Sequence, residues 1–502
     1  MTTRRYKIGQ DRQQVSLLPP SLDEYVSENS LVRAIDLYVD SLDFAALGFH
    51  NTETTNIRGD GQPAYSPNVL MKLYLYGYIN RLRTSRLLER EACLNVELMW
   101  LLQGLKPSHA TIANFRKENL EAIKAVNRDF VKMCRELDLY GGTEVGIDGT
   151  FMHGNASKAS IYTKDKLDKK AEWLAKEIAQ IEEYFTQLEQ NDAQEQDSPP
   201  TSTEDAALAE KLERLKIRQR EYHERQEKLE ASGETQLSET DPDARLLTKR
   251  GQTLAGYNVQ IAVDSKYKLL LHTEVVTDGN DVQQLEPMAF AAKEALDVDS
   301  LIVDADSGYD NPEQIKNCVD NDITPYVPTV NREKAAQEKG RFSHSDFSYD
   351  AETDTYRCPE EQVLTFQGTQ RKKSNKGKKV KTNYRYASQS SVCATCPQRT
   401  KCLPEKTGHR QIYRSEYETV MDQHRARMEA DGKGHMRTRA ALAEHPFGTI
   451  KTQMGWQHFL LRGLEKVRAE MNLQMLSYNF KRVFNIIGIT AFKNHLNGRN
   501  MA

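Results

Sequence analysis

Four acidic side chains, in three segments, occur in sequence settings where a divalent metal ion could bind. Asp148 lies within an apolar run, Ile147-Asp-Gly-Thr, and Asp304 and Asp306 end a second one, Val303-Asp-Ala-Asp-Ser-Gly-Tyr. Glu444 opens a third segment, Glu-His-Pro-Phe-Gly-Thr-Ile-Lys. A carboxylate on a core strand is costly to bury unless it is paired or bound to a metal. Taken singly, each acid is more simply a strand-end, turn or surface residue.

Taken together, the acids could support phosphodiester chemistry. Mg²⁺ prefers oxygen ligands, and one or two carboxylates with substrate phosphate are enough to hold it. Two ions roughly 3.5–4 Å apart could activate a nucleophile and stabilise the leaving oxygen. Lys451 follows Glu444 by seven residues, so a regular helix would put a cation for phosphate on the same face. Pro446 and Gly448 interrupt that segment, and spacing alone favours a surface pair.

Four of the seven cysteines are concentrated in one part of the chain, as Cys358, Cys393-Ala-Thr-Cys396 and Cys402. A Cys-x2-Cys pair supplies two tetrahedral ligands, and the other two thiols could complete a closed structural zinc site. Unliganded thiols are the alternative, whereas disulfides are the weaker explanation in a reducing compartment. The other cysteines, which are Cys93, Cys134 and Cys318, are typical of small buried apolar residues.

The elements around the acids favour a mixed α/β core. Alternating and β-branched residues predict strands at 143–152, 257–264 and 269–276, then a helix at 281–296, a strand at 300–304, a helix at 312–319 and a strand at 324–327. Three antiparallel strands followed by alternating helices and strands indicate a mixed sheet. Asp148 and Asp306 would lie on neighbouring strands of that sheet.

Two inserts interrupt this core. Residues 165–245 carry 22 acidic against 12 basic residues, and an apolar stripe spaced by three and four residues predicts an antiparallel helical hairpin. The hairpin could dimerise, although two helices paired with each other are the simpler interpretation. Residues 329–435 contain an eleven-residue run at 371–381, in which seven residues are basic. The run begins with Arg371, Lys372 and Lys373. Such a run suits phosphate contact, and a solvated disordered loop is the alternative.

The first 140 residues read as helical. Ser108 or Thr111 is the expected N-cap of one helix, after Pro107. A basic group could lie along DNA or be an ordinary solvated helix face, and it comprises Lys72, Arg81, Arg83, Arg86 and Arg90. The sequence alone favours neither interpretation.

Length and composition limit the remaining possibilities. The 502 residues predict about three domains, and 38% hydrophobic with 28% charged residues is enough to build cores. No apolar run is long enough for a membrane helix, and no apolar stretch follows the N-terminal charges as in a secretory signal. We therefore expect a soluble, cytoplasmic protein without a membrane partner.

In combination, these motifs resemble the DDE transposases of bacterial insertion sequences, which have an RNase H-like core. Pro63-Ala-Tyr-Ser-Pro, Arg86-Leu-Leu-Glu and Thr111-Ile-Ala-Asn-Phe-Arg116 are similar to the family's helical N-terminal domain, which binds terminal inverted repeats. Ile147-Asp-Gly-Thr and Ala305-Asp-Ser-Gly-Tyr match the motifs of its first and second acids, so Asp306 rather than Asp304 is the second. Glu444 matches the third acid and Lys451 the family's lysine.

One part of the family signature departs from the pattern. The Tyr-x2-Arg-x3-Glu-x6-Lys motif would place tyrosine at 437 and arginine at 440, where this chain has Arg437 and Ala440. Arg437 and Arg439 are the two candidates for the arginine's role.

The resemblance implies a domain order. We expect a helical DNA-end-binding domain at 1–140, core segments at 141–164 and 246–328, the acidic hairpin at 165–245, the basic four-cysteine insert at 329–435, and C-terminal core helices carrying the catalytic glutamate at 436–502.

It also implies the reaction, which is cleavage at the transposon ends followed by strand transfer into target DNA. Asp148, Asp306 and Glu444 would hold two Mg²⁺ or Mn²⁺ ions, and a homodimer would act on double-stranded DNA, with the hairpin as a candidate contact. DNA contacts are expected from Lys451, Arg437, Arg439, Arg371, Lys372, Lys373, Arg86 and Arg116. Three alternatives are a transposase-derived repressor with a silent site, a stand-alone Mg²⁺-dependent nuclease on the same fold, and a zinc-stapled coiled-coil scaffold, which leaves the acids unexplained.

Overall fold

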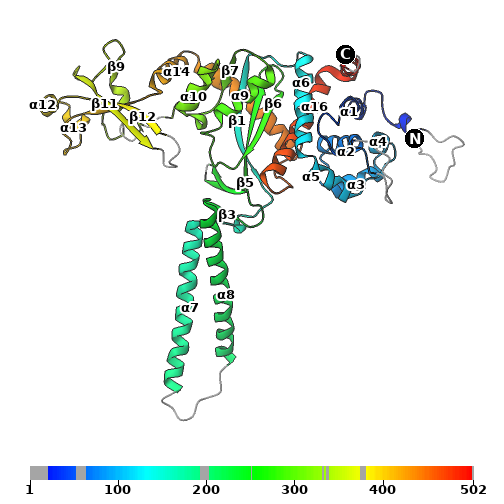
Figure 1. The fold of residues 1–502 in the computed structure, drawn as a ribbon, viewed down its shortest axis with the longest axis horizontal. Helices are drawn as coiled ribbons and strands as arrows, with labels where there is room; N and C mark the ends of the chain where they lie inside the picture. Colours follow the sequence, from blue (N-terminus) through cyan, green and yellow to red (C-terminus); the bar gives the residue numbers. More distant parts are fainter. Residues whose placement is uncertain are drawn as a thin grey trace, which may run out of the picture. The chain divides into compact units, whose positions relative to one another are not determined.

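The computed structural model describes residues 21–52, 64–192, 203–249, 251–330, 333–334, 338–373 and 380–499. The chain forms two compact units (Figure 1). Unit 1 comprises residues 1–137, 153–245 and 448–502, and unit 2 comprises residues 138–152 and 246–447. Residues 448–502, expected in the core, therefore group with the N-terminal helices.

Unit 1 contains the predicted N-terminal helices. They are η1 (Leu22–Tyr25), α1 (Leu31–Asp40), α2 (Pro67–Ile79), α3 (Ser85–Leu94), α4 (Val96–Leu101), α5 (His109–Glu118) and α6 (Leu120–Glu136), followed at the other end of the chain by η5 (Thr449–Gln453) and α16 (Leu464–Arg499). Ser108 is the N-cap of α5, and its side chain accepts a hydrogen bond from the Thr111 amide. The rings of Tyr38, Phe130 and Phe480 lie 5.1–5.8 Å apart, so α1, α6 and α16 share an aromatic core.

The acidic segment of unit 1 is a pair of long helices. The short strands β2 (Ile161–Thr163) and β3 (Gln236–Ser238) pair antiparallel at its base, after the turn η2 (Lys158–Ser160). Helices α7 (Lys164–Asp192) and α8 (Thr203–Ser232) extend from them side by side. The apolar stripe lies between the helices, where Leu174, Ile178, Ile181 and Leu215 are buried. The hairpin thus covers its own apolar stripe.

Unit 2 contains the mixed sheet that the sequence predicts. Its strands are β1 (Glu144–His153), β4 (Arg245–Lys249), β5 (Gln252–Asp264), β6 (Leu270–Val276), β7 (Leu301–Asp304) and β8 (Ile323–Tyr326). The order is β4-β5-β1-β7-β8, with β6 antiparallel to β5, and both β1 with β7 and β7 with β8 are parallel. The helices of this unit include α9 (Leu285–Leu296), η3 (Ser307–Tyr309), α10 (Pro312–Asp320), α14 (Glu418–Ala430) and α15 (Gly432–Gly448). The prediction of a mixed α/β core is confirmed.

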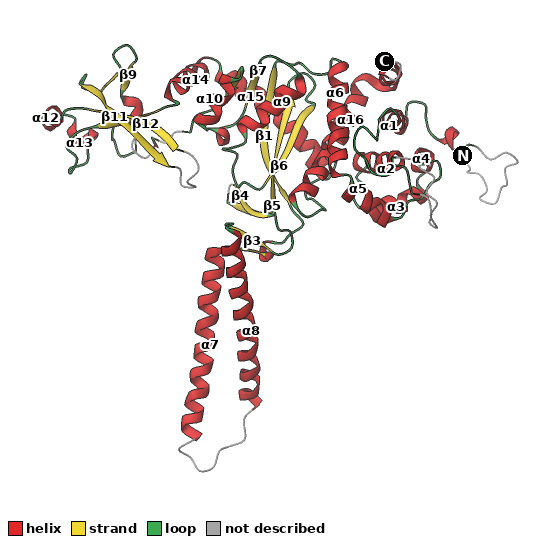
Figure 2. Cartoon of the chain, in the orientation of Figure 1, coloured by secondary structure: helices red, strands yellow, loops and turns green. Residues whose placement is uncertain are grey.

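The four-cysteine insert has a sheet of its own, which the sequence analysis did not predict (Figure 2). Strands β9 (Ser348–Asp350), β10 (Thr355–Arg357), β11 (Val363–Lys373), β12 (Val380–Ala387) and β13 (Gln411–Ser415) pair antiparallel, and η4 (His344–Asp346), α12 (Ser390–Ala394) and α13 (Arg399–Cys402) accompany them. Phe347, Tyr356 and Tyr386 are buried in its core. Arg371 to Lys373 lie in β11 and pair with β12, so this part of the basic run is not a disordered loop. Residues 374–379 lie outside the described residues.

Within the described parts of the chain, no helix combines the length and apolarity that crossing a bilayer requires.

Candidate active site

The parallel pairing of β1 and β7 brings Asp148 and Asp306 to neighbouring positions. Gly146 is registered with Asp304, so each acid lies two residues beyond a paired position. Asp148 accepts a hydrogen bond from the Gly149 amide at 2.9 Å. Asp306 leaves the strand and caps η3, accepting from the Gly308 amide at 2.8 Å. Asp148, within β1, and Asp306, just beyond the end of β7, thus lie at matching positions of two adjacent strands.

Arg439 on α15 connects the two acids. Its Nη2 lies 3.3 Å from Asp148 Oδ1 and 3.8 Å from Asp306 Oδ2. Burial raises the pKa of Asp148 and the guanidinium of Arg439 opposes that rise, while the charge of Asp306 adds to it. The two carboxylates are close enough to feel each other's charge, and a cation lies beside both. Of the two candidate arginines, Arg439 reaches the acids, whereas Arg437 is exposed.

A buried polar network supports the segments that carry both acids. Asp281 Oδ1 accepts hydrogen bonds from Asn258 Nδ2 at 2.8 Å and from Gln260 Nε2 at 2.6 Å. The hydroxyl of Tyr309, fully buried behind Asp306, donates to Gln260 Oε1. The sequence analysis missed this network, although Asn258 and Gln260 alternate on a predicted core strand, where two polar side chains on one face of a buried strand need partners.

Two glycines allow this network to approach the acids. A Cβ at Gly149 would lie 2.4 Å from Gln260 Nε2 and 2.7 Å from Asp281 Oδ1. A Cβ at Gly308 would lie 2.8 Å from Asp306 Oδ1 and 3.5 Å from Asp281 Oδ2. The glycine of Asp-Gly-Thr is therefore required by the close packing of Gln260 and Asp281, and the glycine of Asp-Ser-Gly-Tyr by the close approach of the Asp306 carboxylate.

Glu444 does not join the two aspartates in this structure. It lies on α15 five residues after Arg439, about 140° around a helix of 3.6 residues per turn, and its side chain is exposed. Leu442 occupies the side of α15 that faces β1, 3.1 Å from where a Cβ of Gly146 would lie. Among the described residues, no hydrogen bond or ion pair joins Glu444 to Asp148 or Asp306.

The segment that follows Glu444 is not a regular α-helix. Helix α15 contains Pro446 and gives way to the π-helical turn η5, which carries Lys451. The regular helix that would put Glu444 and Lys451 on one face is therefore not present, because the segment between them changes from α to π geometry.

Two basic residues of the N-terminal helices are buried within unit 1: Arg116, an expected DNA contact, and Lys72, for which the sequence leaves both DNA contact and a solvated face open. Arg116 is 7% exposed, donates to the Tyr78 hydroxyl at 3.1 Å and lies over the ring of Tyr74. Lys72 is 3% exposed and pairs with Asp36 and Asp40 at 2.6 and 2.7 Å. The prediction that Arg116 contacts DNA is contradicted, because its guanidinium is buried against Tyr78 and Tyr74 in the helical core. Arg86 is exposed, as is Arg371 on β11.

The four cysteines of the insert lie on segments that converge beside the second sheet. Cys358 and Cys402 pack against its core. Burial raises the pKa of the Cys402 thiol, and negative charge on Cys393, Cys358 and Cys396 raises it further, so the four sulfurs are within electrostatic reach of one another. Cys393 Sγ also lies 2.9 Å from the Ser388 hydroxyl.

Two family models match the chain. One describes a transposase DDE domain and matches residues 357–484, which include the cysteines, Arg439 and Glu444. The other describes a transposase domain, DUF772, and matches residues 20–118. The chain belongs to the DDE transposases of insertion sequences. These matches confirm the family that the motifs indicate.

The transposase has a distant counterpart among solved structures. The cryo-EM structure of the piggyBac transposase synaptic complex with hairpin DNA is 9% identical, covering 94% of this chain and 79% of that one, with a TM-score of 0.34. This score is too low to establish a shared fold. Comparison with curated proteins gave no significant match.

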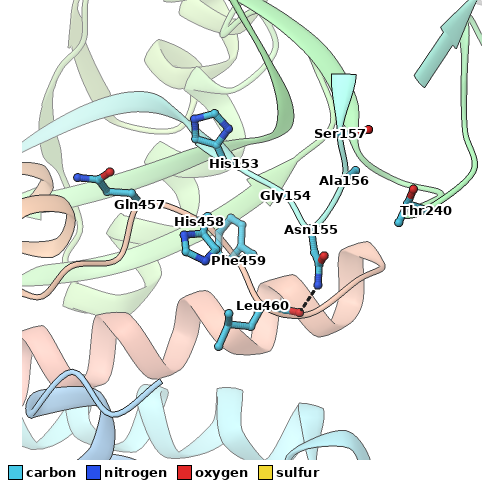
Figure 3. A pocket seen from close by; sticks show the side chains of 10 residues that line it. All are labelled: His153, Gly154, Asn155, Ala156, Ser157, Thr240, Gln457, His458, Phe459 and Leu460. Atoms are coloured by element: carbon cyan, nitrogen blue, oxygen red, sulfur yellow. Dashed lines mark hydrogen bonds between the residues drawn. The ribbon is translucent and has the colours of Figure 1, made fainter. Parts of the chain in front are cut away.

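Unit 1 of the transposase also has a polar cavity of about 640 Å³ that the sequence analysis did not foresee (Figure 3). It is lined by residues 153–157, Thr240 and residues 457–460, among them His153, Asn155 and His458. Asn155 Nδ2 donates to the Leu460 carbonyl at 2.8 Å, which ties the two segments together. None of the predicted site residues lines this cavity.

Proposed function

We propose that the transposase binds the terminal inverted repeats of its insertion sequence and catalyses metal-dependent DNA cleavage and strand transfer. The observation that carries the proposal is the pair Asp148 and Asp306 on adjacent parallel strands, with Arg439 beside both. This arrangement in a mixed sheet also supports an RNase H-like core.

The donor set fits two Mg²⁺ or Mn²⁺ ions, because carboxylate oxygens are the ligands these ions prefer. Asp148 and Asp306 would hold the ions together with Glu444, whose side of α15 has to turn toward the sheet for this. When bound, the ions lower the pKa of the attacking water and stabilise the leaving oxygen. Asp281, hydrogen-bonded to Asn258 and Gln260 of β5, packs beside Gly149, so this network would support the segment that carries Asp148 while DNA binds.

The reaction has two in-line displacements. Water attacks the phosphorus of a phosphodiester at the transposon end. The bond between this phosphorus and the 3′ oxygen breaks, and the 3′ oxygen leaves as a hydroxyl. That hydroxyl then attacks a target phosphodiester, whose own 3′ oxygen leaves, so no covalent bond to the enzyme forms. The guanidinium of Arg439 would offset the negative charge that accumulates around the phosphorus.

DNA phosphates would be contacted by basic residues from both units. The candidates are Arg86, Arg371, Lys372, Lys373, Arg437, Arg439 and Lys451. Each phosphate contact adds about 0.9 to the slope of log affinity against log salt.

Because two ends must be cut together, we propose that a homodimer assembles on DNA. We further propose that Cys358, Cys393, Cys396 and Cys402 bind a structural zinc ion, which would stabilise the small second sheet.

A cleavage assay with a plasmid carrying the flanking DNA tests this function. The wild-type chain should cut at the element ends with Mg²⁺ and not with EDTA, and Asp306→Asn and Glu444→Gln should abolish cutting. Asp299→Asn and Glu429→Gln are matched controls, because both acids are exposed and lie outside the proposed site. End binding without cutting would favour the repressor, and cutting at unrelated positions would favour the nuclease.

A further inference from the structure

A second group of potential metal ligands lies in unit 2, separate from the pair Asp148 and Asp306. Glu144 begins β1, Asp304 ends β7, and His435 lies on the first turn of α15. His435 Nδ1 is 3.0 Å from Glu144 Oε1 and 3.0 Å from Asp304 Oδ1. One ligand atom from each of the three residues lies within 4.8 Å of the other two. Three sequence-distant elements therefore converge on one point.

Asp304 is the least satisfied member of this group. It has no exposed surface, and the groups that face its carboxylate are Nδ1 of His435, 3.0 Å from Oδ1, and the side chain of Glu144; neither oxygen has a hydrogen bond of normal geometry within the described residues. The same holds for Nδ1 of His435. A buried carboxylate without hydrogen bonds is strongly unfavourable unless a cation compensates it. The side chain is aimed at the group's centre, and no described backbone amide there caps it.

The imidazole of His435 is held in position to act as a ligand. Its ring stacks on Tyr326 of β8, with centroids 3.6 Å apart and planes 15° apart. Metal–nitrogen and metal–oxygen bonds of about 2.0–2.2 Å place neighbouring ligand atoms roughly 3 Å apart, which matches the distances from His435 Nδ1 to Glu144 and Asp304. Two carboxylates with one imidazole suit Mn²⁺ or Zn²⁺ better than Mg²⁺, which prefers oxygen alone.

We propose that Glu144, Asp304 and His435 bind a divalent transition-metal ion, Mn²⁺ or Zn²⁺, at a structural site distinct from the catalytic one. The ion ties the first turn of α15 to β1 and β7. Arg439 lies one turn further along α15, so the ion would set its distance from Asp148 and Asp306. Metal binding itself does not depend on the proposed function, whereas this effect on Arg439 does.

Mn²⁺ binding to the full-length chain tests the site. Asp148→Asn and Asp306→Asn together remove two of the three proposed catalytic carboxylates. Mn²⁺ bound at the remaining tight site can then be counted from the decrease in the electron paramagnetic resonance signal of free Mn²⁺. The double variant should retain one Mn²⁺ per chain, and adding His435→Gln should abolish this binding. His223→Gln, at an exposed histidine of α8, should leave it unchanged.

Glu144→Gln gives a second test that leaves α15 intact, and it decides the matter if His435→Gln does not fold by circular dichroism. Zn²⁺ is counted in the same way by mass spectrometry after Cys393→Ser and Cys396→Ser remove the thiol ligands. If the parent retains neither ion, or if binding survives both Glu144→Gln and His435→Gln, the three side chains contact one another without a metal ion and the proposal is wrong. Because none of these chains can cleave DNA, the result is independent of the proposed reaction.

Discussion

Arg439 and Asp148 form an ion pair across the interface between α15 and β1, with Nη2 3.3 Å from Oδ1 and both side chains 18% exposed. The pair joins an arginine from the C-terminal part of unit 2 to an acid almost 300 residues earlier in the chain. It also places a cation beside the second acid, Asp306, at 3.8 Å. Partial burial makes the electrostatic attraction between Arg439 and Asp148 stronger than in an exposed pair, because solvent screens it less.

Arg439→Gln should slow DNA cleavage about tenfold, the effect of losing roughly 1.4 kcal/mol of interaction. Since Arg439 holds down the pKa of Asp148, its removal should also move the acidic limb of the pH–rate profile to higher pH. Arg437→Gln, on the exposed side of the same helix, should leave the profile in place. Equal profiles for both variants would show that Arg439 does not act on Asp148.

Gly149→Ala should destabilise unit 2 by about 1–3 kcal/mol, the usual cost of overpacking. Its new methyl group would lie within 2.7 Å of both Gln260 and Asp281, which are buried and hydrogen-bonded to each other. Gly434→Ala is the matched control, because nothing lies within 4 Å of its Cβ position and alanine favours a helix. Urea unfolding of the two variants gives the comparison, and equal midpoints would contradict the packing seen around Gly149.

The sheet could be predicted from the sequence because its strands alternate or are continuously apolar, and that signal is local. Asp148 and Asp306 were found for the same reason, since an acid in an apolar run is conspicuous. The sheet of the four-cysteine insert was harder to predict from the sequence. Its strands β11 and β12 are rich in lysine, arginine and threonine with few aliphatic residues, so the core formed by Tyr356 and Tyr386 depends on pairing that no local pattern reveals.

The side-chain partners at the site could not be predicted either. Arg116 and Arg86 look alike in sequence, but the hydroxyl of Tyr78 and the ring of Tyr74 bury one of them while the other stays exposed. Asp281 was overlooked because its importance comes from Gln260 and Gly149, which reach it only through tertiary packing. Spacing along the chain likewise could not show that a π-helical turn follows Glu444.

Asp281→Ala should lower the free energy of unfolding by about 2 kcal/mol or more, because it leaves the amides of Asn258 and Gln260 without their shared acceptor. Asp281→Asn should cost less than about 1 kcal/mol, since its amide oxygen can still accept both hydrogen bonds. Chemical denaturation distinguishes the two substitutions. A larger loss for asparagine than for alanine would mean that the charge of Asp281, rather than its acceptor atom, stabilises the unit.

Chelation should selectively destabilise the second sheet if the four cysteines hold zinc. We expect about one zinc per chain in the purified protein, and Cys396→Ser should remove it and lower the thermal unfolding midpoint of this sheet. Cys93→Ser, at an exposed cysteine of α3, should change neither the zinc content nor the midpoint. A chain that contains no zinc when purified under reducing conditions with zinc supplied would contradict this prediction.

The stability of unit 2 should fall as the pH drops below about 6.5, the pKa of an ordinary histidine, because His424 has to stay neutral. His424 is fully buried on α14, and its Nε2 lies 2.8 Å from the Val327 carbonyl oxygen. Burial lowers the pKa of His424, and the nearby charge of Arg427 lowers it further, against an opposing effect of Asp310. The unfolded chain therefore takes up a proton at a pH where the folded chain does not, so acid favours unfolding.

This contribution is complete above the unfolded pKa and is lost as the pH falls, with a slope of at most about 1.4 kcal/mol per pH unit. Urea unfolding between pH 8 and pH 5 should show a shallower decline for His424→Gln than for the wild-type chain. His223→Gln should keep the wild-type slope, because that side chain is 72% exposed and lies on α8, in unit 1. Parallel slopes for the wild-type chain and His424→Gln would mean that His424 accepts its proton in the folded state, with Nδ1 reaching water.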